Sequence, residues 1–200
     1  MNPIMSDAAV SPDTYENLGI ETRKLGMWLF LASEVMFFTG LIGAYIVLRQ
    51  ATPEWPDPTQ ILNIPLTAFN TFLLICSSAT LVKGLSSAQE GDQEGMQVGL
   101  FLTVLLGSLF LFIQAHEYHE LMHIKHLTPS SSIFGSCFFT MTGFHGMHVL
   151  VGVLCMLFVF IKSLRGKYTP QDYKGIEIVG LYWHFVDLVW IILFTIVYLI

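Results

Sequence analysis

Four histidines recur along one stretch of the chain at intervals of three, four and three residues: His116, His119, His123 and His126. On a helix this spacing places all four along one face. Imidazoles on successive turns can bind zinc, nickel or copper. The stretch follows an apolar segment, at the level of a membrane surface, where solvated histidines cost little. We therefore expect a solvated or partner-contacting face, with a metal site as the alternative.

A second group of ionisable residues lies inside apolar segments, where each costs about 2.5–3.5 kcal/mol at mid-bilayer and requires a partner or a purpose. The group comprises Glu34, His145, His148, His184 and Asp187. At about 1.5 Å of rise per residue, these side chains reach similar depths on three different helices. We predict that Glu34 hydrogen-bonds to one of the two histidines at 145 and 148. We also predict that Asp187 is buried against His184 or backbone donors.

Three roles are compatible with these buried groups. They can act as satisfied polar clamps without chemistry, which is our first expectation. They can instead conduct or buffer protons, or hold a metal or heme. A heme clamped between histidines of the third and fourth helices is disfavoured, because His116 and His119 lie near the surface whereas His145 and His148 lie near the middle.

The elements that position these groups are apolar segments. The chain is 54% hydrophobic and 12% charged, with a mean hydropathy of +0.62, which excludes an ordinary soluble surface. About 20 helical residues cross a hydrocarbon core. The sequence predicts an all-α integral membrane protein, a five-transmembrane-helix bundle that follows a polar cytoplasmic tail over residues 1–25. The five spans are expected at about 26–48, 64–82, 96–122, 133–161 and 178–200.

Small and charged residues refine this arrangement. Gly84 and the acidic run 89–94 are expected to separate the second and third spans. Gly40 and Gly43 on the first span, and Gly143 and Gly146 on the fourth, are expected to let helices approach closely. Seven Lys and Arg residues fall on the side of the N-terminus and two on the other, which predicts a cytoplasmic N-terminus and an external C-terminus. The net charge of −6 argues against a nucleic-acid partner.

Three segments combine aromatic and buried ionisable residues in specific patterns: 182–190 (YWHFVDLVW), which is the most specific, 142–149 (TGFHGMHV) and 30–38 (FLASEVMFF). These segments resemble subunit III of the heme-copper oxidases, which reduce oxygen with cytochrome c or quinol as donor. Weaker agreement comes from 69–74 (FNTFLL) and 114–118 (QAHEY). The resemblance runs in order through almost the whole chain. Long members have seven spans, so this chain resembles the short five-span bacterial form.

The resemblance implies a non-catalytic accessory subunit that binds no heme or copper itself. Heme and copper would lie in partner subunits, with subunit I in direct contact and subunit II and small subunits in the same complex. Such a subunit stabilises subunit I, supports proton uptake and lies near a lipid-lined oxygen route in a prokaryotic plasma membrane. Bound phospholipid is expected. Glu34 and Asp187 match the family's buried glutamate and last-helix aspartate, and His145, His148 and His184 match histidines in the same motifs.

Two alternatives remain from the sequence. The chain also suits a subunit III-like partner of a nitric oxide reductase, which shares this architecture. An independent membrane proton or ion carrier would use the intramembrane carboxylates directly, although five spans without internal symmetry fit a transporter poorly. No active site of its own is expected, so enzyme activity would belong to the complex as an oxidoreductase and not to the isolated chain.

Overall fold

The computed structural model describes residues 22–200, which form helices joined by short links and contain no strand. Five helices in this part of the chain are long and apolar enough to cross a membrane. They are α1 (Thr22–Ala51), α3 (Ile64–Glu90), α4 (Gln93–His123), α5 (Ile133–Leu164) and α6 (Lys174–Phe194), the last continued by the π-helical turn η3 (Thr195–Leu199). The short α2 (Pro58–Ile61) lies between α1 and α3. The predicted all-α five-span architecture is confirmed.

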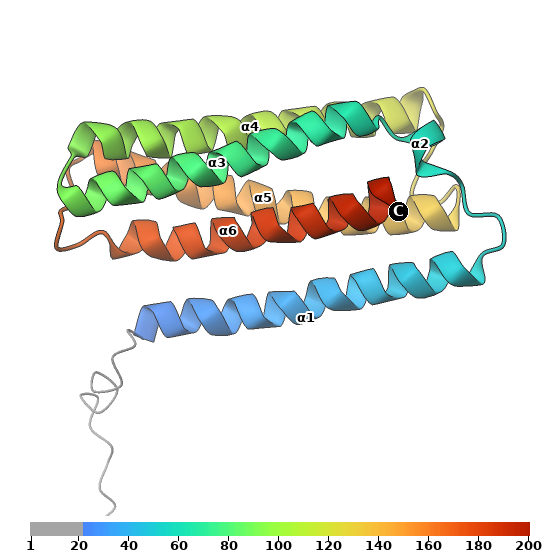
Figure 1. Ribbon diagram of the computed structural model, residues 1–200, viewed down its shortest axis with the longest axis horizontal. Coiled ribbons are helices and arrows are strands. Elements are labelled where there is room, and N and C mark those ends of the chain that lie inside the picture. The colour runs from blue at the N-terminus through green and yellow to red at the C-terminus, as the bar shows by residue number, and fades with distance from the viewer. Residues whose placement is uncertain (1–21) are drawn as a thin grey trace, which may run out of the picture.

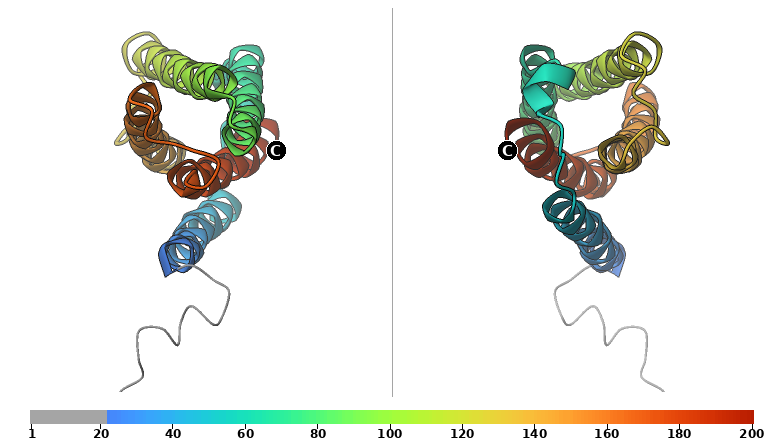
Figure 2. Two further views of the ribbon diagram at one scale, coloured as in Figure 1. Left: turned by 90° about the vertical axis from the view of Figure 1, so that its left-hand side faces the viewer. Right: turned by 90° about the vertical axis from the view of Figure 1, so that its right-hand side faces the viewer.

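Four of the long helices surround a common axis, and the fifth lies outside them. Seen end-on, α3, α4, α5 and α6 form a closed ring, while α1 lies beside α6 on the outer side (Figure 2). In Figure 1, α1 runs along the bundle and its C-terminal end leads to α2 at the far end of the ring. The burial pattern agrees, since α1 buries three side chains, Leu31, Phe38 and Tyr45, along its whole length.

Most helix ends lie within four residues of the predicted boundaries, and the largest difference is at the end of the second span. The predicted tail over 1–25 lies largely outside the described residues, and α1 already begins at Thr22. The second span continues beyond residue 82 to Glu90, where Gly91 ends it with a left-handed backbone (φ 83°) and Asp92 caps α4 through the Gly95 amide. The acidic run therefore does separate the two spans, but Gly84 does not, because it lies inside α3.

Gly84 serves a packing role within that helix. A Cβ atom added to Gly99 of α4 would lie 2.6 Å from the Cα of Gly84, so the two backbones meet with no space for a side chain. The prediction for the first span is wrong, since Gly40 and Gly43 have nothing within 4 Å of such a Cβ. On the fourth span Gly146 does allow a close approach, because its Cβ would lie 2.8 Å from Oε1 of Gln114.

Trp183 of α6 fills the space inside the ring. A Cβ on Gly107 of α4 would lie 2.6 Å from this indole, and one on Gly152 of α5 would lie 2.8 Å from it. The indole Nε1 donates a hydrogen bond to Ser77 of α3 at 3.0 Å. One buried side chain thus contacts the other three helices of the ring. Lipid is as apolar as the helices, so such packing and hydrogen bonding must supply the association free energy.

Replacement of Gly99 by alanine is expected to destabilise the ring by about 1–3 kcal/mol, because the new methyl group meets backbone that cannot rotate away. The measurement is the free energy of unfolding of the detergent-solubilised protein in an SDS titration. Gly43→Ala is the matched control and is expected to be neutral or slightly stabilising, since it adds a helix-favouring residue in open space. Equal losses in the two variants would contradict the close backbone contact.

Candidate functional site

A carboxylate–imidazole pair joins α1 to α5 in the middle of both helices. The Oε2 atom of Glu34 lies 3.0 Å from Nε2 of His148, and the two side chains are 18% and 12% exposed. This contact confirms the predicted pairing of Glu34 with a fourth-span histidine and identifies the partner as His148. The contact also offsets the free-energy cost of placing a carboxyl group at this depth, because hydrogen bonding to the imidazole replaces the lost hydration.

The hydrogen bond of the second ring nitrogen of His148 determines how many protons the pair holds. Nδ1 lies 2.7 Å from the carbonyl oxygen of Phe144, which can only accept, so Nδ1 carries a hydrogen. One further proton then lies between Nε2 and Oε2, on the imidazole of an ion pair or on the carboxyl group of a neutral pair. In both forms the pair holds one transferable proton and has no net charge. Such a pair holds its proton without an uncompensated charge in the membrane, and loss of that proton would leave one net negative charge there.

Aromatic side chains enclose this pair. The ring of Phe38 packs edge-on against the imidazole of His148 at 5.1 Å, and Phe37 stacks against it at 6.4 Å. The Tyr182 hydroxyl of α6 donates to the backbone oxygen of His148 at 2.9 Å. These contacts restrict the imidazole and replace water around the pair, which strengthens its internal electrostatic attraction.

A second polar contact joins α6 to α3 at a similar depth. The Ser78 hydroxyl and Nδ1 of His184 share a hydrogen bond of 2.9 Å, and Ser78 also faces the carboxyl group of Asp187. Asp187 is 8% exposed, and its Oδ1 has no hydrogen-bond partner among residues 22–200. Asp187 is therefore buried near His184 as predicted, and the hydroxyl of Ser78, which was not expected from the sequence, lies beside both and shares a hydrogen bond with His184.

His145 is separated from these contacts. The imidazole is completely buried inside the ring, stacked on Trp190 at 4.7 Å and edge-on to Phe110 at 5.9 Å. Neither of its ring nitrogens hydrogen-bonds to any residue in the described part of the chain. The i, i+3 spacing of His145 and His148 therefore places the two imidazoles in different environments, one facing the ring interior and the other facing α1. The five predicted residues form separate contacts, not one cluster.

Glu117 of α4 is a buried carboxyl group that the sequence analysis missed. It is 4% exposed and accepts hydrogen bonds from the hydroxyls of Thr67 at 3.0 Å and Tyr198 at 3.3 Å. This part of α4 was expected at the membrane surface because it follows the apolar stretch that ends near Ile113. A periodic signal was available, because the buried positions Gly107, Phe110, Gln114, Glu117 and Leu121 follow one another at helical spacing.

His116, His119 and His123 lie on α4, on a different face from Glu117. The predicted stripe of four is wrong for His126, because α4 ends at His123 and His126 has a left-handed backbone (φ 53°). All four imidazoles belong to exposed residues, and the rings of His119 and His123 lie 4.5 Å apart, centre to centre. Within residues 22–200 no group of three or more His, Cys, Asp or Glu side chains is arranged to hold a metal ion. The stripe is thus exposed as expected, and its four members do not assemble into one site.

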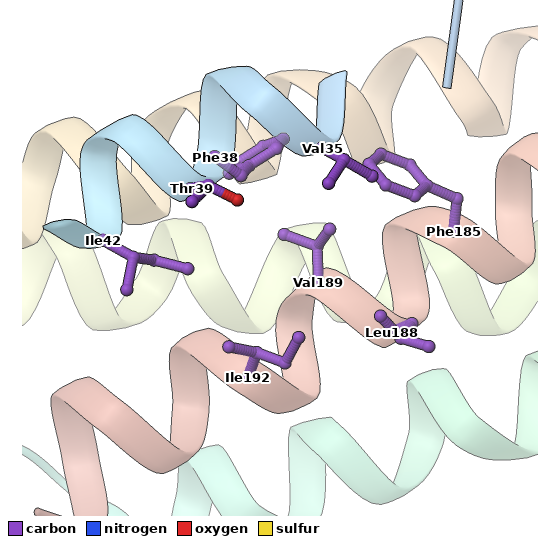
Figure 3. Close-up of a pocket in the computed structure, with 8 residues that line it drawn as sticks. All are labelled: Val35, Phe38, Thr39, Ile42, Phe185, Leu188, Val189 and Ile192. Atoms are coloured by element: carbon purple, nitrogen blue, oxygen red, sulfur yellow. The ribbon is translucent and has the colours of Figure 1, made fainter. Parts of the chain in front are cut away.

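Between α1 and α6 lies an apolar groove (Figure 3). Val35, Phe38 and Ile42 line it from α1, and Leu188 and Ile192 line it from α6. Polar contacts of α1 with other helices occur instead at its two ends and at Glu34. These are the ion pair of Lys24 with Glu177 at 2.5 Å, the Glu34–His148 pair, and a hydrogen bond from Arg49 to the backbone oxygen of Ile200.

The fold and its polar contacts define a multi-span helical membrane protein whose buried ionisable groups join helices to one another. Sequence comparison specifies the family, since residues 5–200 match the family described as cytochrome c oxidase subunit III. Probable cytochrome c oxidase subunit 3 of Nocardia farcinica is 40% identical over 176 residues, which cover 88% of this chain and 86% of that protein. Cytochrome c oxidase subunit 3 of Synechocystis is 39% identical over 90% of this chain and 76% of the relative. The chain belongs to the cytochrome c oxidase subunit III family.

The Glu34–His148 contact predicts energetic coupling between α1 and α5. In a double-mutant cycle of Glu34→Ala and His148→Ala, the coupling free energy is expected at about 0.6–1.7 kcal/mol, the range of hydrogen bonds between membrane helices. The readout is again the free energy of unfolding in mixed micelles. A cycle of Ser33→Ala with His148→Ala serves as control, because the Ser33 hydroxyl bonds within its own helix to Phe30. Coupling near zero in both cycles would refute the pairing.

The burial of Glu117 predicts a large difference between two glutamates three residues apart. Glu117→Ala is expected to cost about 1–3 kcal/mol of unfolding free energy, because it leaves the buried Tyr198 hydroxyl without its acceptor and removes the contact to Thr67, whose hydroxyl keeps the Asn63 carbonyl. Glu120→Ala, which removes a partly exposed contact to Lys125 at 3.6 Å, is expected to cost at most about 1 kcal/mol. Thermal or SDS unfolding of the two variants tests this, and a larger loss for Glu120→Ala would be incompatible with the structure.

Proposed function

We propose that this chain acts as a non-catalytic accessory subunit of a heme-copper terminal oxidase in a prokaryotic plasma membrane. In this role it packs directly against subunit I, lies in one complex with subunit II and small subunits, and stabilises the core that reduces oxygen to water and pumps protons. Heme and copper belong to those partners. The observation that carries the proposal is the family match over residues 5–200, together with relatives of similar length named subunit 3 of cytochrome c oxidase.

The buried pair on α1 and α5 suits a supporting role in proton uptake. Glu34 and His148 together hold one transferable proton in an aromatic, water-poor environment. The pair is also the mid-membrane polar attachment of a helix whose other polar contacts with the ring lie at its two ends. A change in its protonation would therefore alter both the local charge and the attachment of α1. Such a group can tune hydration beside a proton entry without carrying out the redox chemistry.

The outer surface of α1 suits a lipid environment and a partner subunit. Large apolar side chains on this helix are exposed, among them Trp28, Leu29, Met36 and Val47. The groove between α1 and α6 is lined by apolar side chains and one hydroxyl group, a lining that accepts an acyl chain. Bound phospholipid and the membrane-spanning surface of subunit I are the contacts that we assign to these faces.

The first experiment is gentle detergent purification through a tag on this chain, followed by an optical spectrum and identification of the chains that co-purify. Heme bands together with a larger multi-span subunit are expected, and the identity of that subunit separates oxygen chemistry from nitric oxide chemistry. If the larger subunit belongs to a nitric oxide reductase, this chain is instead the subunit III-like partner of that enzyme. A colourless protein that migrates alone would favour an independent carrier instead.

Within such a complex, Glu34→Ala and Asp187→Ala are expected to weaken assembly or shorten the time over which turnover is sustained. Both remove carboxyl groups that join helices of this chain, so the heme spectrum of the assembled complex should stay unchanged. Glu90→Ala, an exposed carboxylate at the end of α3, is the control and should behave as wild type. Loss of the heme signal from a fully assembled mutant complex would contradict a non-catalytic role.

A further inference from the structure

Two members of the histidine stripe differ from the others in their mutual geometry. His119 and His123 are four residues apart on α4, both are exposed, and their ring centres lie 4.5 Å apart with an angle of 40° between the planes. In the described part of the chain no hydrogen bond engages their ring nitrogens. Both residues follow the apolar stretch of α4 that ends near Ile113, at roughly 9 and 15 Å beyond it along the helix axis. The pair is therefore accessible from water.

We propose that His119 and His123 form a two-histidine binding site for a divalent transition-metal ion, with Zn²⁺ or Cu²⁺ as the class of ligand. Imidazole is a preferred ligand of both ions. With metal–nitrogen distances of about 2.0–2.1 Å, two imidazoles that bind one ion have ring centres roughly 4.5 Å apart at the right angle of a tetragonal copper site, and roughly 5.2 Å apart at the tetrahedral angle of zinc. The observed separation of 4.5 Å matches the first value and is within about 1 Å of the second. Small side-chain rotations would bring the nitrogens onto the ion while the helix stays unchanged.

The surroundings limit the site to these two protein ligands. The Glu120 carboxylate contacts Lys125 at 3.6 Å and is engaged there. His116 and His126 make no ring contact with the pair, although all four residues are exposed. Water would complete the coordination, so an ion bound here is exchangeable and differs from a closed structural zinc site. The ion would bridge two consecutive turns at the C-terminal end of α4 and stabilise the helix there.

The stripe itself provides the matched control. Equilibrium dialysis of the full-length chain, as purified in detergent, against radioactive Zn²⁺ is compared for wild type, His119→Ala/His123→Ala and His116→Ala/His126→Ala. Wild type and the second variant are expected to bind one more zinc ion per chain than the first variant at micromolar zinc. His123→Gln alone should weaken binding roughly tenfold or more, because chelation by the second imidazole is lost. With Cu²⁺ as probe, electron paramagnetic resonance should show two coordinating nitrogens in wild type.

Two results would overturn the proposal. Equal zinc binding by wild type and the His119→Ala/His123→Ala variant would mean that the pair holds no ion. An equal loss in the His116→Ala/His126→Ala variant would mean that the stripe binds metal diffusely and not through the close pair. Circular dichroism and elution volume establish that each variant is folded. If the pair variant fails to fold, His119→Gln and His123→Gln give the same comparison one ligand at a time.

Discussion

The indole of Trp183 imposes the constraint on which the arrangement of the other helices depends. It occupies the interior of the α3–α6 ring, where Gly107 and Gly152 leave the space for it and Ser77 accepts its hydrogen bond. Apolar burial does not by itself hold helices together in lipid, because a lipid tail offers the same contact. The position of α6, and hence the surface against which α1 packs, follows from this one side chain and the two glycines.

Helix α3 supplies most of the hydrogen bonds that complete the ring. Five of its hydroxyl groups bond to other helices, in the contacts Thr67–Glu117, Thr71–Trp190, Ser77–Trp183, Ser78–His184 and Thr80–Thr103. Serine and threonine cost little to insert, yet each provides both a donor and an acceptor where water is absent. By comparison α1 is weakly attached, since its mid-membrane polar contact is a single carboxylate–imidazole pair. The ring is thus the rigid part, and α1 is the helix whose position a change in protonation could alter.

Much of this arrangement could be predicted from the sequence. Continuous apolar segments identified all five spans, and equal depths on two helices correctly paired Glu34 with one of two histidines. Depth alone did not show which way a side chain faces, so the sequence left open whether Glu34 meets His145 or His148. Glu117 was missed because it follows the end of the apolar stretch near Ile113. Gly84 was assigned to a loop because its contact with Gly99 exists only after the helices associate. Hydropathy alone does not show which neighbouring helix a side chain faces, because that depends on how the helices pack together.

At mid-membrane, one buried carboxylate–imidazole pair attaches α1 to the ring of four helices, and we propose that the chain functions in this form within a heme-bearing complex. A high-resolution cryo-electron microscopy map of the complex purified through this chain is the most direct test. We expect this chain to pack against the heme-bearing subunit, with Glu34 and His148 in hydrogen-bonding contact and Trp183 between Gly107 and Gly152. A map in which α1 is detached from α5, with Glu34 facing a partner subunit or lipid and far from His148, would contradict it.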